Sequence, residues 1–345
     1  MSDDLVEGVL LGKRRSIARA ISRVEDGGTA SQALLAALHP HTGRAHIVGV
    51  TGPPGSGKST LVNALALHFR QESASHEVER QGSRVGIIAV DPTSPFSGGA
   101  ILGDRIRMRD LAGDPGIFIR SMASRGSLGG LAWATADAVK VLDAAGYDLV
   151  IVETVGAGQA EVNIARTAHT TVVVEVPGLG DDIQAIKAGI LEIADIFAVN
   201  KADLQGADHA VMALRMMLDM NSGSNQPVLH HGHLTEILTA TGDKGGIAEV
   251  PTWRPPIVKT VATRRDGVPE LARAIVDHRL HLEGTGELAQ KERERAAAEL
   301  ETIIQQESLQ RVLARTDQAH LAALLDRIVR RDLDPYTASQ QLLER

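Results

Sequence analysis

Short runs of β-branched and other apolar residues alternate with helical stretches through the middle of the chain. Nearly continuous apolar runs that are separated by helices are typical of parallel strands buried on both faces of a sheet. The runs that fit this pattern are Ile47–Val50, Val85–Val90, Leu149–Val152, Thr171–Val176, Ile196–Val199 and Ile257–Val261. The pattern therefore predicts an α/β fold with a mostly parallel sheet covered by helices.

Both ends of the chain have a helical pattern instead. Apolar residues recur at helical spacing as far as Leu38, which predicts two short helices, and an apolar stripe that includes Leu300 runs along a charged C-terminal stretch. We therefore expect a helical extension over residues 1–44, a central α/β domain over residues 45–284 and a helical arm over residues 285–345.

Composition and charge exclude several classes of function. Hydrophobic residues make up 43% of the 345 residues, which is enough for a large core, but aromatic residues make up only 2% and the net charge is −7. A nucleic-acid interface would need a basic surface or aromatic platforms. The chain has no cysteine, which excludes disulfides and thiolate metal sites, and no apolar run long enough to span a membrane. We expect a soluble, cytoplasmic protein that binds neither nucleic acid nor membranes.

A phosphate-binding motif, G-x-x-x-x-G-K-[ST], lies between the first predicted strand and a predicted helix over Thr60–Phe69. Its glycines let backbone N–H groups close around phosphates, and the helix N-terminus adds partial positive charge. Lys58 would reach the β- and γ-phosphates, and the Ser59 hydroxyl would bind Mg²⁺. The predicted loop comprises Gly52, Pro53, Pro54, Gly55, Ser56, Gly57, Lys58, Ser59 and Thr60.

A second motif, Asn200-Lys201-Ala202-Asp203, directly follows the strand predicted at Ile196–Val199. A carboxylate at Asp203 would accept hydrogen bonds from N1–H and the exocyclic amine of guanine, whereas adenine has no amine at that position. A site built around such pairing rejects the wrong base strongly. Asn and Asp also favour helix N-caps, so a purely structural role is the alternative. With a phosphate loop upstream, the motif favours GTP and GDP.

Three acidic residues are candidates for the magnesium side of the site. Glu153 ends the strand predicted at Leu149–Val152, and Asp91 and Asp104 follow the strand predicted at Val85–Val90. Carboxylates at strand ends that face the phosphates suit Mg²⁺, which binds few protein ligands and keeps several waters. The alternatives are a turn acid before proline for Asp91 and a helix N-cap for Asp104.

The residues after Glu153 bear on the rate of hydrolysis. The pattern is E-x-x-G where Ras-like proteins have D-x-x-G, and Ala157 occupies the position where those proteins carry the glutamine that orients the attacking water. Gln159, two residues further on, need not replace it. The sequence therefore predicts slow intrinsic hydrolysis that waits for a partner to order the site.

Taken together, six motifs resemble those of the MeaB/ArgK/MMAA family of GTPases over about residues 45–285. They are Gly52–Thr60, Asp91–Pro95, Gly98–Arg105, Glu153–Gln159, Val176–Gln184 and Asn200–Asp203. The resemblance implies a GTPase chaperone of an adenosylcobalamin-dependent acyl-CoA mutase, such as methylmalonyl-CoA mutase. Members gate cofactor loading and help to exchange inactivated cofactor. They are homodimers with an N-terminal helical extension, a P-loop domain and a C-terminal dimerisation arm.

The resemblance also assigns roles to individual residues. It implies magnesium-binding or catalytic roles for Asp91, Asp104 and Glu153 beside Lys58, and a switch segment that ends at Lys187, a candidate GTP contact. It further places Val261, Ala262 and Thr263 in the last base-contacting loop. Many members have a Ser-Ala pair in that loop, which this chain lacks, but backbone N–H groups can still bind the guanine O6 atom.

Three other functions compete with this interpretation. A nickel-type metal-delivery GTPase would need a thiolate or histidine cluster, and the candidate here is His230–His233 within an irregular stretch over residues 221–256. A kinase would need a base that positions the acceptor, and the sequence indicates none. A structural dimer with vestigial nucleotide binding would have no need for intact Lys58, Ser59 and Glu153.

Overall fold

The computed structural model describes residues 2–72, 83–92, 111, 113–124, 130–154, 160–178, 192–221 and 252–343. These residues fall into two compact units. The first lies within residues 1–226 and 249–288, and the second, as far as it is described, within residues 289–345.

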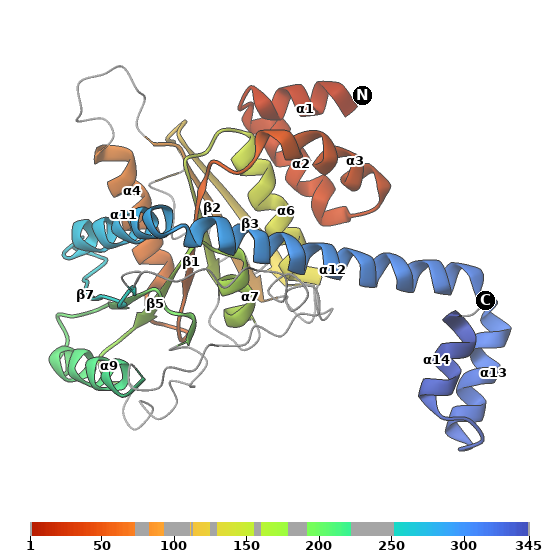
Figure 1. The fold of residues 1–345 in the computed structure, drawn as a ribbon. Coiled ribbons are helices and arrows are strands. Elements are labelled where there is room, and N and C mark those ends of the chain that lie inside the picture. The colour runs from red at the N-terminus through yellow and green to blue at the C-terminus, as the bar shows by residue number, and fades with distance from the viewer. Residues whose placement is uncertain are drawn as a thin grey trace. The chain divides into compact units, whose positions relative to one another are not determined.

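A parallel sheet forms the centre of the first unit (Figure 1). Within the described residues it has seven strands, in the order β3-β2-β4-β1-β5-β6-β7. They are β1 (His46–Thr51), β2 (Val85–Pro92), β3 (Ile117–Ser124), β4 (Leu149–Thr154), β5 (Thr170–Glu175), β6 (Ile196–Val199) and β7 (Ile257–Lys259). All neighbouring strands pair in parallel. The predicted α/β fold is confirmed, and β3 is an additional strand that the apolar runs did not predict.

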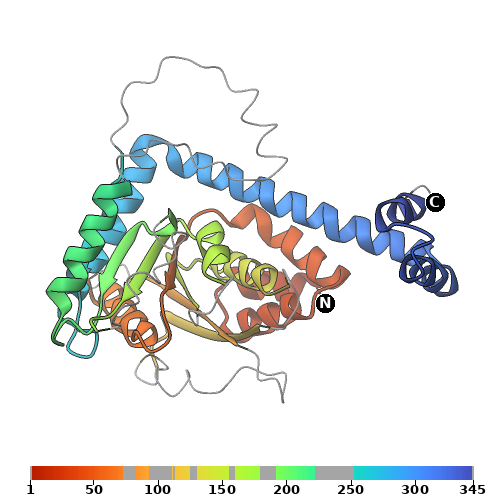
Figure 2. The ribbon, with the colours of Figure 1, turned by 90° about the horizontal axis from the view of Figure 1, so that it is seen from below.

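Helices cover both faces of the sheet. On one face lie α4 (Lys58–Glu72) and α11 (Val268–Thr285), and on the other lie α6 (Gly130–Ala144), α7 (Ala160–Thr167) and α9 (Ala207–Asn221). Figure 2 shows α9 beside the strands of the β5–β7 side. Each strand therefore contributes alternate residues to two apolar clusters, which explains the nearly continuous apolar runs.

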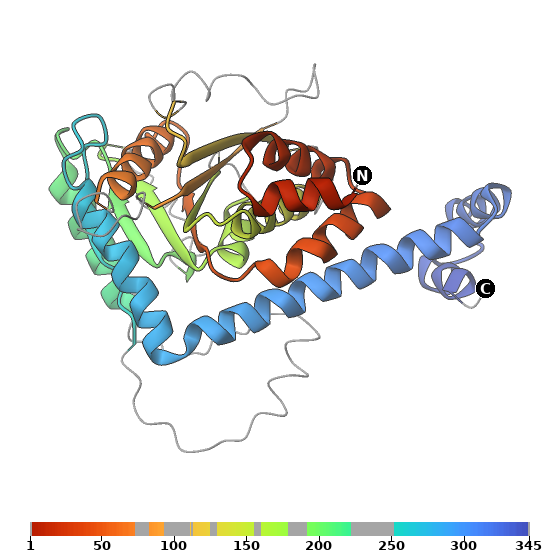
Figure 3. The same ribbon diagram turned by 90° about the horizontal axis from the view of Figure 1, so that it is seen from above.

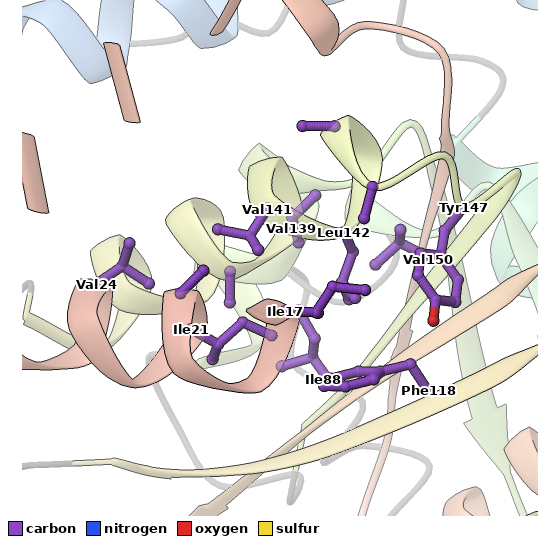
Figure 4. Packing of buried hydrophobic residues seen from close by; sticks show 14 of the residues in the cluster. Ile17, Ile21, Val24, Ile88, Phe118, Val139, Val141, Leu142, Tyr147 and Val150 are labelled. Atoms are coloured by element: carbon purple, nitrogen blue, oxygen red, sulfur yellow. The ribbon is translucent and has the colours of Figure 1, made fainter. Parts of the chain in front are cut away.

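Three N-terminal helices, rather than the two expected, pack against α6 (Figure 3). They are α1 (Ser2–Leu10), α2 (Arg14–Asp26) and α3 (Thr29–Leu38), followed by the short 3₁₀ helix η1 (His39–His41). The chain turns between α1 and α2 at Gly12, whose φ of 67° interrupts the helical periodicity. In Figure 4, Ile17 and Ile21 of α2 share one packed cluster with Leu142 of α6 and Phe118 of β3.

Arginine side chains join this extension to the edge of the sheet. The Arg14 guanidinium donates hydrogen bonds to the carbonyls of Asp114 (3.1 Å) and Ile117 (2.6 Å), at the start of β3. Arg120 of β3 forms an ion pair with Glu25 of α2. The edge strand β3 and the residue Asp114 before it are therefore bonded to α2 of the extension.

The second unit is helical. It contains most of α12 (Glu287–Arg315), together with α13 (Gln318–Val329) and α14 (Pro335–Leu343). Large apolar side chains are exposed on these helices; they include Leu300, Ile303, Ile304, Leu309, Leu313, Leu325, Val329, Tyr336 and Leu343. No helix in the described ranges combines the length and apolar character needed to cross a membrane.

Candidate nucleotide-binding site

The predicted phosphate loop connects the central strand β1 to α4. All three of its glycines have positive φ: 141° at Gly52, 79° at Gly55 and 85° at Gly57. A Cβ atom at Gly52 would lie 2.1 Å from the Val174 carbonyl oxygen, and one at Gly57 would lie 2.5 Å from Nδ2 of Asn200. Backbone conformation and close packing therefore both require glycine at these last two positions.

The Lys58 ammonium bends back over this loop. Its Nζ atom donates hydrogen bonds to the carbonyl oxygens of Gly52 and Pro53, each at 2.9 Å, and the residue is 6% exposed. Because Lys58 is also the first residue of α4, its charge adds to the partial positive charge of the helix N-terminus. This end of α4 therefore has the positive charge that the predicted phosphate site requires.

The structure brings together two of the predicted magnesium-side residues. The Ser59 hydroxyl donates a hydrogen bond of 2.6 Å to Oε1 of Glu153, which is 5% exposed. The pairing of β1 with β4 places Glu153 opposite Val50, just before the phosphate loop begins. A buried carboxylate beside a hydroxyl at the edge of a phosphate loop is an oxygen donor set that fits Mg²⁺.

Asp91 lies, like Glu153, at the carboxyl end of its strand, so both are at the same end of the sheet. It lies in β2, where Ala89 pairs with Glu153, so its backbone lies two residues beyond the level of that carboxylate; its side chain is not described. Asp104 lies outside the described residues, as do Lys187, Ala157, Gln159 and His230–His233. Their predicted roles remain predictions.

A pocket lies next to the phosphate loop, where three predicted segments meet. Its walls come from the end of the loop, from Asn200–Asp203 (the N-K-x-D segment) and from the segment after β7. It is lined by Gly57, Thr60, Asn200, Lys201, Asp203, Leu204, Val261, Ala262 and Thr263. The side chain of Asp203 is 39% exposed, which leaves this carboxylate accessible to a ligand.

Asn200 joins the three segments. Its Nδ2 atom donates to the Ser56 carbonyl (2.8 Å), and its Oδ1 atom accepts from the Ala262 N–H (3.1 Å) and the Thr260 hydroxyl (3.2 Å). The residue is 2% exposed, so these bonds are shielded from water. Asn200 and Thr260, which sequence reasoning missed, therefore brace the pocket, and the predicted contact of Asn200 with the base stays a prediction.

Lys201 is held in an unusual conformation beside Asn200. Its φ is 55°, in the left-handed region that residues other than glycine rarely adopt. Its Nζ atom donates a hydrogen bond of 2.9 Å to the Gly55 carbonyl. The stem of Lys201 therefore bridges the N-K-x-D segment and the phosphate loop.

In the segment after β7, Val261–Thr263, two of the three backbone N–H groups donate hydrogen bonds within the protein. The Val261 N–H donates to the Asp266 carbonyl at 2.9 Å, and the Ala262 N–H donates to Asn200. Among the described residues, no acceptor lies opposite the Thr263 N–H. Of the three predicted base contacts, Thr263 is therefore the one whose backbone donor is available to a ligand.

Within the described ranges, no three histidine or acidic side chains come together in a way that could hold a metal ion. The candidate cluster of the metal-delivery alternative, His230–His233, lies outside those ranges.

Comparison with known proteins gives consistent matches. The family model described as methylmalonyl-CoA mutase-associated GTPase MeaB matches residues 17–317. A Pyrococcus abyssi protein named as a GTPase is 46% identical over 344 residues, covering 100% of this chain and 96% of that protein. GTPase ArgK of Escherichia coli is 34% identical over 338 residues, covering 96% and 93% respectively.

A solved structure described as an LAO/AO transport system kinase has a similar fold. Its TM-score is 0.66 at 26% identity, and the match covers 99% of this chain and 96% of that chain.

Proposed function

Because this chain belongs to the MeaB family of GTPases, we propose that it couples GTP binding and hydrolysis to the cofactor state of an adenosylcobalamin-dependent acyl-CoA mutase. The observation that carries the nucleotide part is the meeting of the phosphate loop, the Asp203 carboxylate and the Thr263 N–H around one pocket. The client part rests on the family, whose description names methylmalonyl-CoA mutase.

Phosphate binding would change the partners of Lys58. Its ammonium is held by two loop carbonyls, which are neutral acceptors, and the phosphate oxygens of GTP carry full charge. Charge-assisted hydrogen bonds are about twice as strong as neutral ones. Lys58 would therefore turn to the β- and γ-phosphates without leaving the loop, where it would stabilise the charge that develops during hydrolysis.

Ser59 and Glu153 would hold Mg²⁺, with Asp91 and Asp104 as further candidates. When bound, Mg²⁺ neutralises charge on the β- and γ-phosphates. The Ser59–Glu153 hydrogen bond keeps both oxygen donors at the same edge of the phosphate loop. Ala157 supplies no group to orient the attacking water, so hydrolysis would be slow until the client mutase orders the site.

Guanine would be recognised from two sides of the pocket. Asp203 would accept hydrogen bonds from N1–H and the 2-amino group, while the Thr263 N–H would donate to O6. Adenine carries an amine in place of O6 and has no N1–H, so it would leave both protein groups unpaired. Lys187 would add a contact from the predicted switch segment.

The exposed apolar side chains of α12, α13 and α14 support homodimer formation. Large apolar side chains repeat along these helices, and such surfaces commonly mark protein interfaces. We therefore propose that this arm forms the dimer interface. We also propose that the protein is located in the cytoplasm.

The decisive experiment measures GTP turnover with and without a purified adenosylcobalamin-dependent acyl-CoA mutase. We expect slow turnover alone and acceleration by the mutase, with free phosphate as the product. The Lys58→Ala variant should lose both the basal and the stimulated rates. Turnover that no mutase changes would remove the client from the proposal, and phosphoryl transfer to a protein or small molecule would favour the kinase alternative.

A further inference from the structure

Arg264 follows the pocket-lining residue Thr263 and lies within a tightly closed turn. The Val261 N–H donates to the Asp266 carbonyl and the Arg264 N–H donates to the Val261 carbonyl, both at 2.9 Å. A Cβ at Gly267 would lie 1.9 Å from the Lys259 carbonyl oxygen, so the turn also depends on glycine at its end. The backbone that carries the Arg264 side chain is therefore well defined.

The Arg264 guanidinium lies between two carboxylates. Its Nε atom donates a hydrogen bond of 2.8 Å to Oδ2 of Asp266, and its Nη1 atom lies 3.7 Å from Oδ2 of Asp203. Asp266 belongs to the same turn, whereas Asp203 belongs to the opposite wall of the pocket. Arg264 thus links the two walls through charged groups that are 57% and 39% exposed, while Asn200 links them through buried hydrogen bonds.

This arrangement suits a carboxylate that must be ready to accept two hydrogen bonds from a base. A carboxylate has about four lone-pair sites, so Asp203 can retain Arg264 while it binds two base donors. A partly exposed aspartate that no cation restrains would have to be ordered when the ligand binds, at a cost in affinity. Arg264, itself anchored by Asp266, reduces that cost.

From this geometry we infer that Arg264 is a specificity-determining positioning residue, which holds the Asp203 carboxylate toward a purine that carries a 2-amino group. The inference rests on the proposed guanine-binding role of the pocket. Arg264 acts through Asp203 and needs no contact of its own with the base. Because both side chains are partly exposed, its effect should be modest, roughly three- to fivefold in affinity.

The test compares the binding of GDP with that of IDP, which retains N1–H but lacks the 2-amino group. In Arg264→Ala we expect GDP affinity to fall about three- to fivefold and IDP affinity to fall less, so that the GDP:IDP preference shrinks. Arg264→Lys retains the charge without the guanidinium fork, so it should restore part of the preference. In an Asp203→Asn background, Arg264→Ala should change the preference no further, because the residue through which it acts is absent.

Arg265→Asn is the matched control. It removes the same charge from the adjacent position, and asparagine tolerates the left-handed backbone that Arg265 adopts at φ 63°. This variant should keep the wild-type GDP:IDP preference. Thermal unfolding of all variants shows whether the turn itself is damaged.

The possible results separate this inference from the function on which it rests. A wild-type protein that binds ADP as well as GDP would refute the guanine-binding role itself. If the wild type prefers GDP but Arg264→Ala keeps the GDP:IDP ratio, the positioning role alone is wrong. Tighter GDP binding in Arg264→Ala would show that Arg264 competes with the base for the Asp203 carboxylate. Equal losses for both nucleotides with a lowered melting temperature would show a structural role, and either result overturns the inference.

Discussion

The Asn200 side chain makes three hydrogen bonds, one to the phosphate loop and two to the segment after β7, and the latter two use both lone pairs of its oxygen. Each buried bond contributes roughly 1 kcal/mol, and an unpaired buried group costs more. Gly57 leaves the space that the Asn200 amide occupies. At the scale of single residues, Asn200 therefore holds the walls of the pocket together, whereas the partly exposed Asp203 carboxylate is the group proposed to read the base.

The recognition role of Asp203 can be tested by replacing its carboxylate. In Asp203→Asn an amide N–H₂ faces the two base donors of guanine, so GDP affinity should fall roughly a hundredfold or more. XDP, which carries an oxygen at C2, should gain affinity. Competition binding with GDP, XDP and ADP measures both effects.

The matched control for this prediction is Asp208→Asn. It removes a carboxylate from the first turn of α9, where the Asp208 side chain is 92% exposed and pairs with Lys259. It should bind the three nucleotides as the wild type does. Retained discrimination against ADP and unchanged GDP affinity in Asp203→Asn would refute the role.

At the scale of elements, the order of the strands assembles the site. The central position of β1, between β4 and β5, places the phosphate loop beside Glu153 on one side and close to Val174 on the other. The edge strand β3 was not predicted because Arg120 and Ser121 interrupt its apolar run. Arg120 instead bonds to Ser22 and Glu25 of the N-terminal extension, a contact that the apolar pattern does not indicate.

A further contact between elements gives a prediction for stability against pH. Arg70 of α4 donates hydrogen bonds of 3.0 Å and 2.8 Å to the Asp114 carboxylate, which precedes β3. The bond from Arg70 holds the pKa of Asp114 below its ordinary value of 3.8. A carboxyl group whose pKa is lower in the folded state stabilises the fold above its unfolded pKa, and this contribution is lost as the pH falls through the folded pKa.

Asp114→Asn should therefore destabilise the protein at neutral pH by about 1 kcal/mol. The difference from wild type should shrink as the pH falls below the ordinary carboxyl pKa of 3.8. Urea unfolding at a series of pH values measures it, with Asp277→Asn at an exposed position of α11 as the control. A difference that stays constant down to acidic pH would show that the Asp114 charge is not responsible.

At the scale of the whole molecule, the helical arm carries a series of exposed large apolar side chains among the residues that the structure describes. Ile304 of α12 is 50% exposed. If the arm forms the proposed homodimer, a charge at this position would be buried at the interface, so Ile304→Asp should give monomers in sedimentation experiments. Gln305→Asp adds the same charge at the next position, where glutamine is already polar, and should remain dimeric. A dimeric Ile304→Asp variant would place the interface elsewhere.

The sequence by itself determined the fold class, the phosphate loop and the N-K-x-D segment. These features depend on local requirements: glycine where the loop packs against backbone, apolar runs where strands are buried on two faces, and a helix directly after the loop. The tertiary structure decided which distant groups meet. Ser59 and Glu153 are 94 residues apart, and the pairing of β1 with β4, together with the loop that leads from β1 into α4, brings them within hydrogen-bonding distance. It also decided that Asn200 braces the pocket and that Arg264 reaches Asp203, because hydrogen bonds and ion pairs depend on spatial proximity, which residue spacing does not specify.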